Sequence, residues 1–379
     1  MLKVGILGCG NLGNQVASLA KRTKNFPAVA INASERDIDS VKGYIECIIF
    51  GDKAGSGKDR TIAKEFLKNN VKQLIADEAL KNLVEDNDYI FVVTSAGGGT
   101  GSGTGPVLTH VLTDFYANSE KPKTFINVGV LPAIGESVGA QRNAAGYINE
   151  LRQRDKGVYM LFDNNRVKAP TNEIFEKVNA AIVDSICVIR GDYSNDSPYG
   201  MIDEKDMHKI VTQPGLIFVD RIQNIFVEDI AANGSVEELM LRHINTENCM
   251  VPIDRNKIVR RMGVISYLSE DLHGYFDDNL PKIRSFYGEP MEDFRHYAVN
   301  ETGSSEENGV ALILSGLTIP MNRVEKIKQR IDAVDKEFDR QASNEKLEDL
   351  VEHNAKYDVT NQQARQKKEF DLDSIFDKY

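Results

Sequence analysis

A glycine-rich segment set between two apolar stretches limits most strongly what this chain can fold into. Residues 95–106 (SAGGGTGSGTGP) follow the apolar run 89–94 and precede the helical pattern 107–116. Glycine lets backbone N–H groups crowd round a phosphate, hydroxyls add donors, and the start of a helix attracts an anion. A flexible linker does not join a core strand to a core helix. The segment therefore predicts a phosphate-binding loop.

Apolar runs alternate with helical patterns through the first half of the chain. The expected strands are residues 3–7, 28–32, 89–94, 124–130 and 158–163. Helical spacing lies between them at residues 62–83, 107–116 and 143–152, and a glycine turn at residues 8–13 leads into a helix that ends near Arg22. Continuous apolar strands that alternate with helices predict an α/β fold with a parallel sheet covered on both faces.

The second half, which follows a long helical pattern at residues 171–189, shows a different arrangement of apolar runs and helical patterns. Its expected strands, residues 216–221, 263–268 and 310–317, are separated by helices, which is typical of a smaller α+β domain. We therefore expect a nucleotide-binding domain at residues 1–170, a connecting helix at 171–190, a second domain at 191–320, a C-terminal helix at 321–353 and a flexible tail at 354–379.

The composition disfavours several classes of protein. The 379 residues carry a net charge of -11, which opposes direct binding to bare nucleic acid. No apolar run is long enough to cross a membrane, and the N-terminal residues MLKVGILGCG resemble a strand instead of a signal peptide. We therefore expect a cytoplasmic protein without direct membrane binding. The cysteines form no CxxC pair and the histidines show no zinc spacing, so we expect reduced thiols and no metal-binding side chains.

Two further glycine loops accompany the first. Residues 8–13 (GCGNLG) fit the GxGxxG pattern of dinucleotide-binding domains, so an NAD-binding Rossmann oxidoreductase stays open as an alternative. That alternative expects an acid at the end of the second strand, where this chain has Asn32 and only later Glu35. Residues 51–60 nearly imitate a Walker A motif, but no hydroxyl follows Lys58 to bind Mg²⁺. Two phosphate loops on one sheet favour a nucleoside triphosphate.

The segment 97–103 (GGGTGSG) resembles the signature loop of the tubulin/FtsZ superfamily of GTPases. Other loops of that family follow the same order along nearly the whole chain, at residues 8–13, 32–34, 53–60 and 130–137. The resemblance implies a tubulin-like fold, with GTP or GDP and Mg²⁺ as cofactors. The nucleotide-binding residues that it implies in these loops are Gly8, Gly10, Asn11, Gly13, Asn32, Gly55, Gly57, Lys58, Gly97, Gly98, Gly99, Thr100, Gly101, Ser102 and Gly103.

Four other residues match the base and ribose contacts of the same family. Glu136 takes the position of the ribose-binding acid, and Arg142 that of a neighbouring base contact. Phe175 and Asn179 are spaced i and i+4 on the long helical pattern and therefore share one helix face. They match the family's guanine-contacting pair, although an aromatic side chain such as Phe175 also suits plain core packing.

Residues 200–206 (GMIDEKD) resemble the family's synergy loop, which supplies catalytic acids to a neighbouring subunit. Asp203 and Asp206 match the two acids, whereas Met201 replaces the usual asparagine. Without the resemblance, these acids also suit a solvated helix start. The resemblance implies a head-to-tail homopolymer that hydrolyses GTP at each junction between subunits.

Several stretches are most similar to the TubZ group of plasmid and phage tubulins, among them residues 54–60, 161–165 and 201–211. The similarity implies filaments in the cytoplasm of a bacterial host that move plasmid or phage DNA through a separate DNA-binding adaptor. Residues 370–379 would then form a short amphipathic hook for the adaptor or the neighbouring subunit. A phage spindle tubulin that positions replicating DNA is the alternative within the superfamily.

Overall fold

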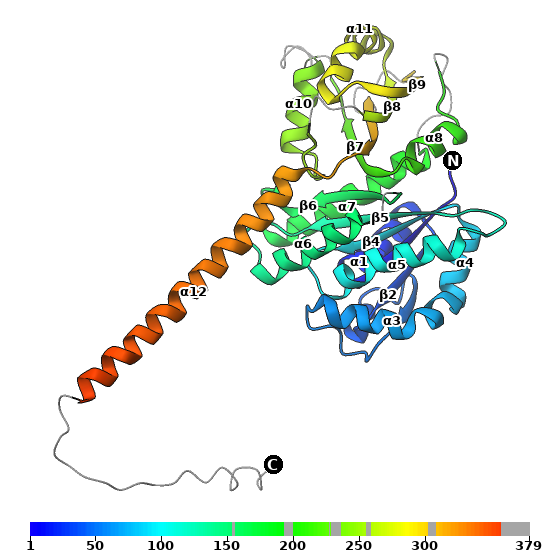
Figure 1. The fold of residues 1–379 in the computed structure, drawn as a ribbon. Coiled ribbons are helices and arrows are strands. Elements are labelled where there is room, and N and C mark those ends of the chain that lie inside the picture. Colours follow the sequence, from blue (N-terminus) through cyan, green and yellow to red (C-terminus); the bar gives the residue numbers. More distant parts are fainter. Residues whose placement is uncertain are drawn as a thin grey trace. The chain divides into compact units, whose positions relative to one another are not determined.

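A single mixed sheet organises the first of the two units into which the chain divides, Met1–Arg330 and Ile331–Tyr379 (Figure 1). The computed structural model describes residues 1–153, 156–192, 200–226, 228, 236–254, 259–301 and 308–357. Within these ranges the sheet has ten strands in the order β3-β2-β1-β4-β5-β6-β7-β10-β8-β9. The strands are β1 (Val4–Cys9), β2 (Ala28–Asn32), β3 (Glu46–Ile49), β4 (Tyr89–Ser95), β5 (Thr124–Leu131), β6 (Val158–Asp163), β7 (Gly215–Gln223), β8 (Val259–Leu268), β9 (Pro290–Val299) and β10 (Gly309–Leu317).

Helices connect these strands and cover the sheet. In chain order they are α1 (Gly10–Lys24), α2 (Glu35–Asp39), α3 (Arg60–Ala76), α4 (Glu78–Asp86), α5 (Thr100–Tyr116), α6 (Val138–Arg152), the 3₁₀ turn η1 (Asn164–Arg166), α7 (Thr171–Arg190), α8 (Glu204–Thr212), α10 (Val236–Thr246), α11 (Glu270–Tyr287) and α12 (Met321–Tyr357). The predicted boundaries at residues 170, 190 and 320 all fall inside the first unit and remain predictions.

The six strands from β3 to β6 are parallel, so their carboxyl ends meet at one edge of the sheet. The crossover from β1 through α1 runs toward one side of the sheet, whereas the crossovers through α5 and α6 run toward the other. Right-handed crossovers of opposite direction place their helices on opposite faces. Buried apolar side chains of these strands form the core, including Leu7, Ile31 and Val92. The predicted parallel sheet with both faces covered is confirmed.

The second half of the chain continues the same sheet. Strand β7 joins β6 through only two residue pairs, Val158 with Gly215 and Tyr159 with Leu216. Strand β10 then lies antiparallel between β7 and β8, and β9 closes the sheet parallel to β8. The sequence did not predict β3 or β9. Strand β3 is short and half-buried, and β9 is an edge strand rich in charged residues, so neither shows a continuous apolar run.

The structure corrects the expected limits of several helices. The glycine-rich segment is not all loop, because α5 already begins at Thr100. Residues 62–83 belong to two helices, since Asp77 ends α3 and its carboxylate caps α4 at the Ala79 N–H, 2.9 Å away. Helix α6 begins after the cap residue Ser137, five residues earlier than its apolar pattern indicated. Helix α12 reaches Tyr357, and the tail segment 370–379 lies outside the described residues.

Candidate active site

A cavity of about 810 Å³ opens where the loops at the carboxyl ends of the parallel strands meet α7. This volume lies within the range that small-molecule and cofactor sites occupy, and this edge is where ligands of α/β sheets bind. Thirteen of the residues predicted from the sequence line it: Gly10, Asn11, Gly55, Gly57, Lys58, Gly97, Gly98, Gly99, Thr100, Gly101, Glu136, Phe175 and Asn179.

The glycine-rich segment gives the cavity an anion-binding floor. The Ser95 hydroxyl accepts from the N–H groups of Gly97 and Gly98, each at 3.3 Å, which shapes the turn before α5. Helix α5 starts at Thr100 behind Gly99, which provides no side-chain cap for its first N–H groups. The first residues of α5, Thr100 and Gly101, line the cavity, and the uncapped N–H groups and positive dipole end of a helix suit a phosphate.

The predicted residues Gly8, Gly13 and Gly103 do not line the cavity but allow the surrounding backbone to pack closely. A Cβ on Gly8 would overlap the carbonyl oxygen of Gly13, and a Cβ on Gly13 that of Val93. A Cβ on Gly103 would overlap the Arg60 carbonyl oxygen. Small residues are therefore required where β1, α1, α3 and α5 approach one another.

Two glycines bring separate loops together at the cavity itself. Gly10 adopts a φ of 75°, and a Cβ there would lie 2.9 Å from the Gly101 backbone nitrogen. A Cβ on Gly99 would lie 2.6 Å from the carbonyl carbon of Lys58. The hydroxyls of Ser56 and Thr100, 3.2 Å apart, also join the loop at residues 53–60 to the glycine-rich segment. The loop at residues 53–60 thus sits directly on the glycine-rich segment.

Asn143 holds these two loops in place and was not predicted. Its side-chain Nδ2 donates to the carbonyl oxygens of Lys58 at 2.9 Å, Gly97 at 3.1 Å and Gly98 at 3.3 Å. Asn143 is buried on α6, whereas its neighbour Arg142, the predicted base contact, is exposed and does not line the cavity. The structure thus places Asn143, and not the predicted Arg142, against the loops that line the cavity.

Glu136 and Asn164 form one end of the cavity. The Glu136 carboxylate accepts from the Ala133 N–H at 2.7 Å and from Asn164 Nδ2 at 3.3 Å. Asn164 comes from η1 at the end of β6 and was not among the predicted contacts, although its segment was singled out. Its Oδ1 atom is buried and has no hydrogen-bond donor in the described part of the chain. The carboxylate and this carbonyl oxygen both suit the hydroxyl or N–H groups of a ligand.

Helix α7 supplies the facing wall. Phe175 and Asn179 both line the cavity, and Phe175 is 42% exposed, so plain core packing does not account for it. The Oδ1 atom of Asn179 is buried without a donor from any described residue. Buried carbonyl oxygens are nearly always hydrogen-bonded. A flat ring next to an unsatisfied amide oxygen suits a planar base with an N–H edge.

Two other predicted residues support the cavity without lining it. Asn32 is buried at the end of β2, where its Oδ1 accepts from the Ser34 N–H at 3.1 Å. Ser102 is buried in α5, and its hydroxyl donates to the carbonyl oxygens of Gly98 and Gly99. Both side chains therefore stabilise the loop backbones that border the cavity.

The acids Asp203 and Asp206 lie at the opposite edge of the sheet. Asp203 caps α8 and accepts from the Asp206 N–H at 2.8 Å. The next residue, Glu204, has Oε1 3.3 Å from the amino group of Met1, which precedes the amino end of β1. Strand β1 spans six residues, roughly 20 Å at the usual rise per residue. Neither acid lines the cavity, and the length of β1 separates the two places.

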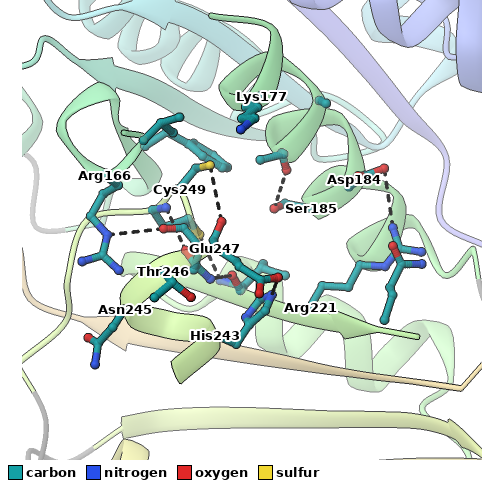
Figure 2. A pocket seen from close by; sticks show the side chains of 18 of the residues that line it. Arg166, Lys177, Asp184, Ser185, Arg221, His243, Asn245, Thr246, Glu247 and Cys249 are labelled. Atoms are coloured by element: carbon teal, nitrogen blue, oxygen red, sulfur yellow. Dashed lines mark hydrogen bonds and ion pairs between the residues drawn. The ribbon is translucent and has the colours of Figure 1, made fainter. Parts of the chain in front are cut away.

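A second cavity of about 550 Å³ lies between α7, β7 and α10 (Figure 2). Its wall includes His243, whose Nδ1 is 2.7 Å from Oδ1 of the buried Asp220, and Arg221, which pairs with Asp184 at 3.5 Å. Burial lowers the pKa of His243, but the hydrogen bond and charge of Asp220 raise it more, so the net shift is upward. None of the glycine loops reaches this cavity, so the loops predicted to bind a nucleotide belong to the first one.

Comparison with known proteins identifies the domain that contains most of the first cavity. The model of the Tubulin/FtsZ family GTPase domain matches residues 3–171. The chain carries a tubulin/FtsZ GTPase domain. This match spans the glycine-rich segment and the loops before it, and it favours the tubulin-like interpretation of residues 8–13 over the dinucleotide-binding one.

The relatives of this GTPase domain include proteins similar to the whole chain. The tubulin-like protein TubZ of Clostridium botulinum C phage is 24% identical over 387 aligned positions, which cover 97% of this chain and 96% of that protein. The tubulin-like protein CetZ of Pyrococcus horikoshii is 30% identical over 192 positions, which cover 48% of this chain and 50% of CetZ.

Solved structures show that the fold extends beyond the GTPase domain. The crystal structure of Clostridium botulinum phage c-st TubZ matches with a TM-score of 0.68 at 21% identity and covers 88% of this chain and 98% of that one. A GTPγS-form protofilament of Bacillus thuringiensis serovar israelensis TubZ gives 0.73 at 16% identity, with coverage of 90% and 94%. The tubulin-like fold predicted from the sequence is therefore confirmed.

The described residues contain neither a helix suited to a membrane nor a grouping suited to a metal ion. None of the helices in the described ranges combines the length and the apolar character that a bilayer crossing requires. In the same ranges, no three His, Cys, Asp or Glu side chains are grouped so that they could hold a metal ion.

Proposed function

We propose that this chain binds GTP in the larger cavity and hydrolyses it where two copies stack head to tail. The observation that carries the proposal is the separation of the two halves of the site. The cavity lies at the carboxyl edge of the sheet, whereas Asp203 and Asp206 lie at the amino edge of the same sheet. One copy therefore has every part of the site, but cannot bring the parts together.

A second copy displaced along the strand direction completes the site. Its Asp203 and Asp206 then face the γ-phosphate that the first copy holds, and they orient and polarise the attacking water. The amides around Gly97, Gly98 and Gly99 stabilise the charge on the transferring phosphoryl group. Such a contact joins two different surfaces and repeats without closing, so it builds a filament.

Mg²⁺ fits this site as a companion of the nucleotide. The described residues offer no cluster of metal-binding side chains, so the ion would be held mainly by the phosphates and water, which Mg²⁺ readily accepts. When bound, it neutralises charge on the phosphates. The Ser56 and Thr100 hydroxyls, 3.2 Å apart on the cavity wall, would offer the ion oxygen ligands from the chain itself.

The proposal extends to assembly and cargo. Two solved relatives, CetZ2 of Haloferax volcanii and Bacillus thuringiensis TubZ, are protofilaments, which supports a homopolymer of this chain. The similarity to a phage TubZ over 97% of this chain supports work on plasmid or phage DNA in a bacterial cytoplasm. A DNA-binding adaptor that takes up residues 370–379 would link filament and cargo. Recruitment of adaptor–DNA complexes that survives deletion of residues 370–379 would argue against that role.

Dilution tests the shared site. GTP hydrolysis per molecule is measured from below to above the concentration at which light scattering detects assembly. We expect the rate per molecule to rise with assembly.

Asp206→Ala filaments should form with GTP and persist, since that change removes a carboxylate without removing the α8 cap. Asp203→Ser is the second variant, because serine retains a cap but no charge. Fast hydrolysis by either variant would contradict the assignment of the acids.

A further inference from the structure

The first turn of α12 contributes an arginine that is almost completely buried beside the nucleotide cavity. Arg323 is 5% exposed, and its partner Asp163 at the end of β6 is 2% exposed. Arg323 Nε donates to Asp163 Oδ2 at 2.7 Å, and Nη2 donates to Asp163 Oδ1 at 3.0 Å. The same Nη2 donates to the carbonyl oxygen of Pro132 at 2.6 Å. Arg323 itself does not line the cavity.

These contacts join the two segments that form the Glu136 end of the cavity. Pro132 begins the loop at residues 132–137, which we name the ribose loop, and Asp163 immediately precedes η1. Asp163 Oδ1 also accepts from the Asn165 N–H at 3.0 Å, and Asn165 Oδ1 accepts from the Ile134 N–H at 3.3 Å. The guanidinium thus fixes the spacing between the ribose loop and η1 from outside the cavity.

The cavity-lining side chains depend on that spacing. Glu136 of the ribose loop and Asn164 of η1 meet across it at 3.3 Å. A planar guanidinium fork can satisfy one carboxylate through two N–H groups and reach a carbonyl at the same time, which a lysine ammonium cannot do with the same geometry. Ile327, one turn further along α12, is also buried.

We propose that Arg323 is a positioning residue for the ribose end of the nucleotide site. It acts through the ribose loop and η1 on Glu136 and Asn164, and it makes the first turn of α12 part of the site without touching the nucleotide. The inference rests on the proposed function, because GTP must occupy the cavity with its ribose against Glu136. The phosphate-binding loops are tied to each other by Asn143, and the hydrogen bonds of Arg323 go to Asp163 and Pro132 instead.

Arg323→Lys is the informative variant. It keeps a positive charge next to the buried Asp163, whereas an uncharged replacement would leave that carboxylate unpaired and put folding at risk. Arg330→Lys makes the same chemical change at an exposed position of the same helix and serves as the matched control. Binding of GTP and of 2′,3′-dideoxy-GTP is measured for both variants and for wild type by competition with a fluorescent GDP.

Wild type and Arg330→Lys should bind GTP more tightly than the dideoxy analogue, because the ribose hydroxyls meet Glu136. Arg323→Lys should lose about tenfold in GTP affinity, comparable to one charged hydrogen bond, and little in affinity for the analogue. A general loosening of the fold would weaken both ligands equally, and that result would overturn the inference. An unchanged preference in Arg323→Lys, or no preference in wild type, would also overturn it. Wild type that binds no GTP at all would overturn the proposed function as well.

Discussion

Asn143 donates a hydrogen bond of 2.9 Å to the carbonyl oxygen of Lys58 and thereby joins helix α6 to the loop before α3. The same amide reaches Gly97 and Gly98 on the glycine-rich segment. One buried side chain therefore sets the distance between two loops that line the cavity. Because a carboxamide has two N–H bonds for three carbonyl oxygens, it is shared among them instead of belonging to one loop.

Removing this amide should weaken nucleotide binding. We expect Asn143→Ala to cost about 1–3 kcal/mol in GTP binding, because the carbonyl oxygens of Lys58, Gly97 and Gly98 lose the donor that they share and the two loops can separate. Arg142→Ala is the control, as its side chain is exposed on the same helix. Titration of fluorescent GDP followed by GTP competition measures both. If Arg142→Ala were the more damaging change, the result would favour the base contact predicted from the sequence and contradict the role given to Asn143.

The ring of Phe175 should matter to the ligand more than to the fold. It is 42% exposed in the cavity wall, so Phe175→Ala removes little core packing. Stacking of a base on an aromatic ring contributes about 1–3 kcal/mol, so we expect a loss of roughly 5- to 150-fold in GTP affinity. Phe115→Ala provides a comparison, since Phe115 is 59% exposed and lies outside the cavity. Equal affinities for the two variants would show that no base stacks on Phe175.

The close approach at Gly13 should be visible in stability. A Cβ there would overlap the carbonyl oxygen of Val93, a backbone atom that cannot turn away. We expect Gly13→Ala to lower the free energy of unfolding by about 2 kcal/mol or more. Gly43→Ala adds the same methyl group where no heavy atom lies within 4 Å, and should change little. Urea denaturation compares them, and equal stabilities would mean that β1, α1 and β4 are not packed as described.

The pair of His243 and Asp220 predicts a pH dependence of stability. The pKa of His243 is raised above its ordinary 6.5 in the fold, despite the opposing effect of burial, by the hydrogen bond and charge of Asp220 and by Glu247. A group whose pKa is raised on folding stabilises the protein below its unfolded pKa, and that contribution disappears as the pH rises through the folded pKa. His243→Gln retains an N–H donor but does not titrate.

Wild type should therefore exceed His243→Gln in melting temperature most clearly near about pH 6, and the difference should shrink toward about pH 8. Thermal melts of both proteins in matched buffers test this. A difference in melting temperature that stays constant or grows with rising pH would contradict a raised His243 pKa in the folded protein.

Local sequence pattern predicts the phosphate-binding loop, because the glycine-rich segment follows an uninterrupted apolar strand. Phe175 and Asn179 share one face of α7, but their role as base contacts comes from the family resemblance and remains a prediction. Asn143 was missed because the start of α6 was placed at its apolar stripe instead of at the cap Ser137. The available signal for the true start of α6 is Ser137, a residue type that often caps helices. Its hydroxyl accepts from the Ala140 N–H three residues later.

Other features could not follow from local pattern. Arg323 stands in a helix that is charged on most sides, and its partner Asp163 is 160 positions away in the chain. Only the fold brings these two together. Strand β9 carries Glu292, Asp293 and Arg295 because an edge strand exposes much of its surface, so its sequence resembles a loop.

Complementation between two defective variants tests the shared site most directly. Asp206→Ala has an intact cavity but lacks one acid. Gly98→Asp has intact acids, but places a carboxylate among the phosphates at a glycine whose nearest neighbouring atoms would be 3.9 Å from a new Cβ. Each variant alone should hydrolyse GTP slowly. Mixed in equal amounts they should recover up to about a quarter of the wild-type rate, because about one junction in four pairs an intact cavity with intact acids. A mixture no faster than the sum of its separate components would contradict catalysis across the junction.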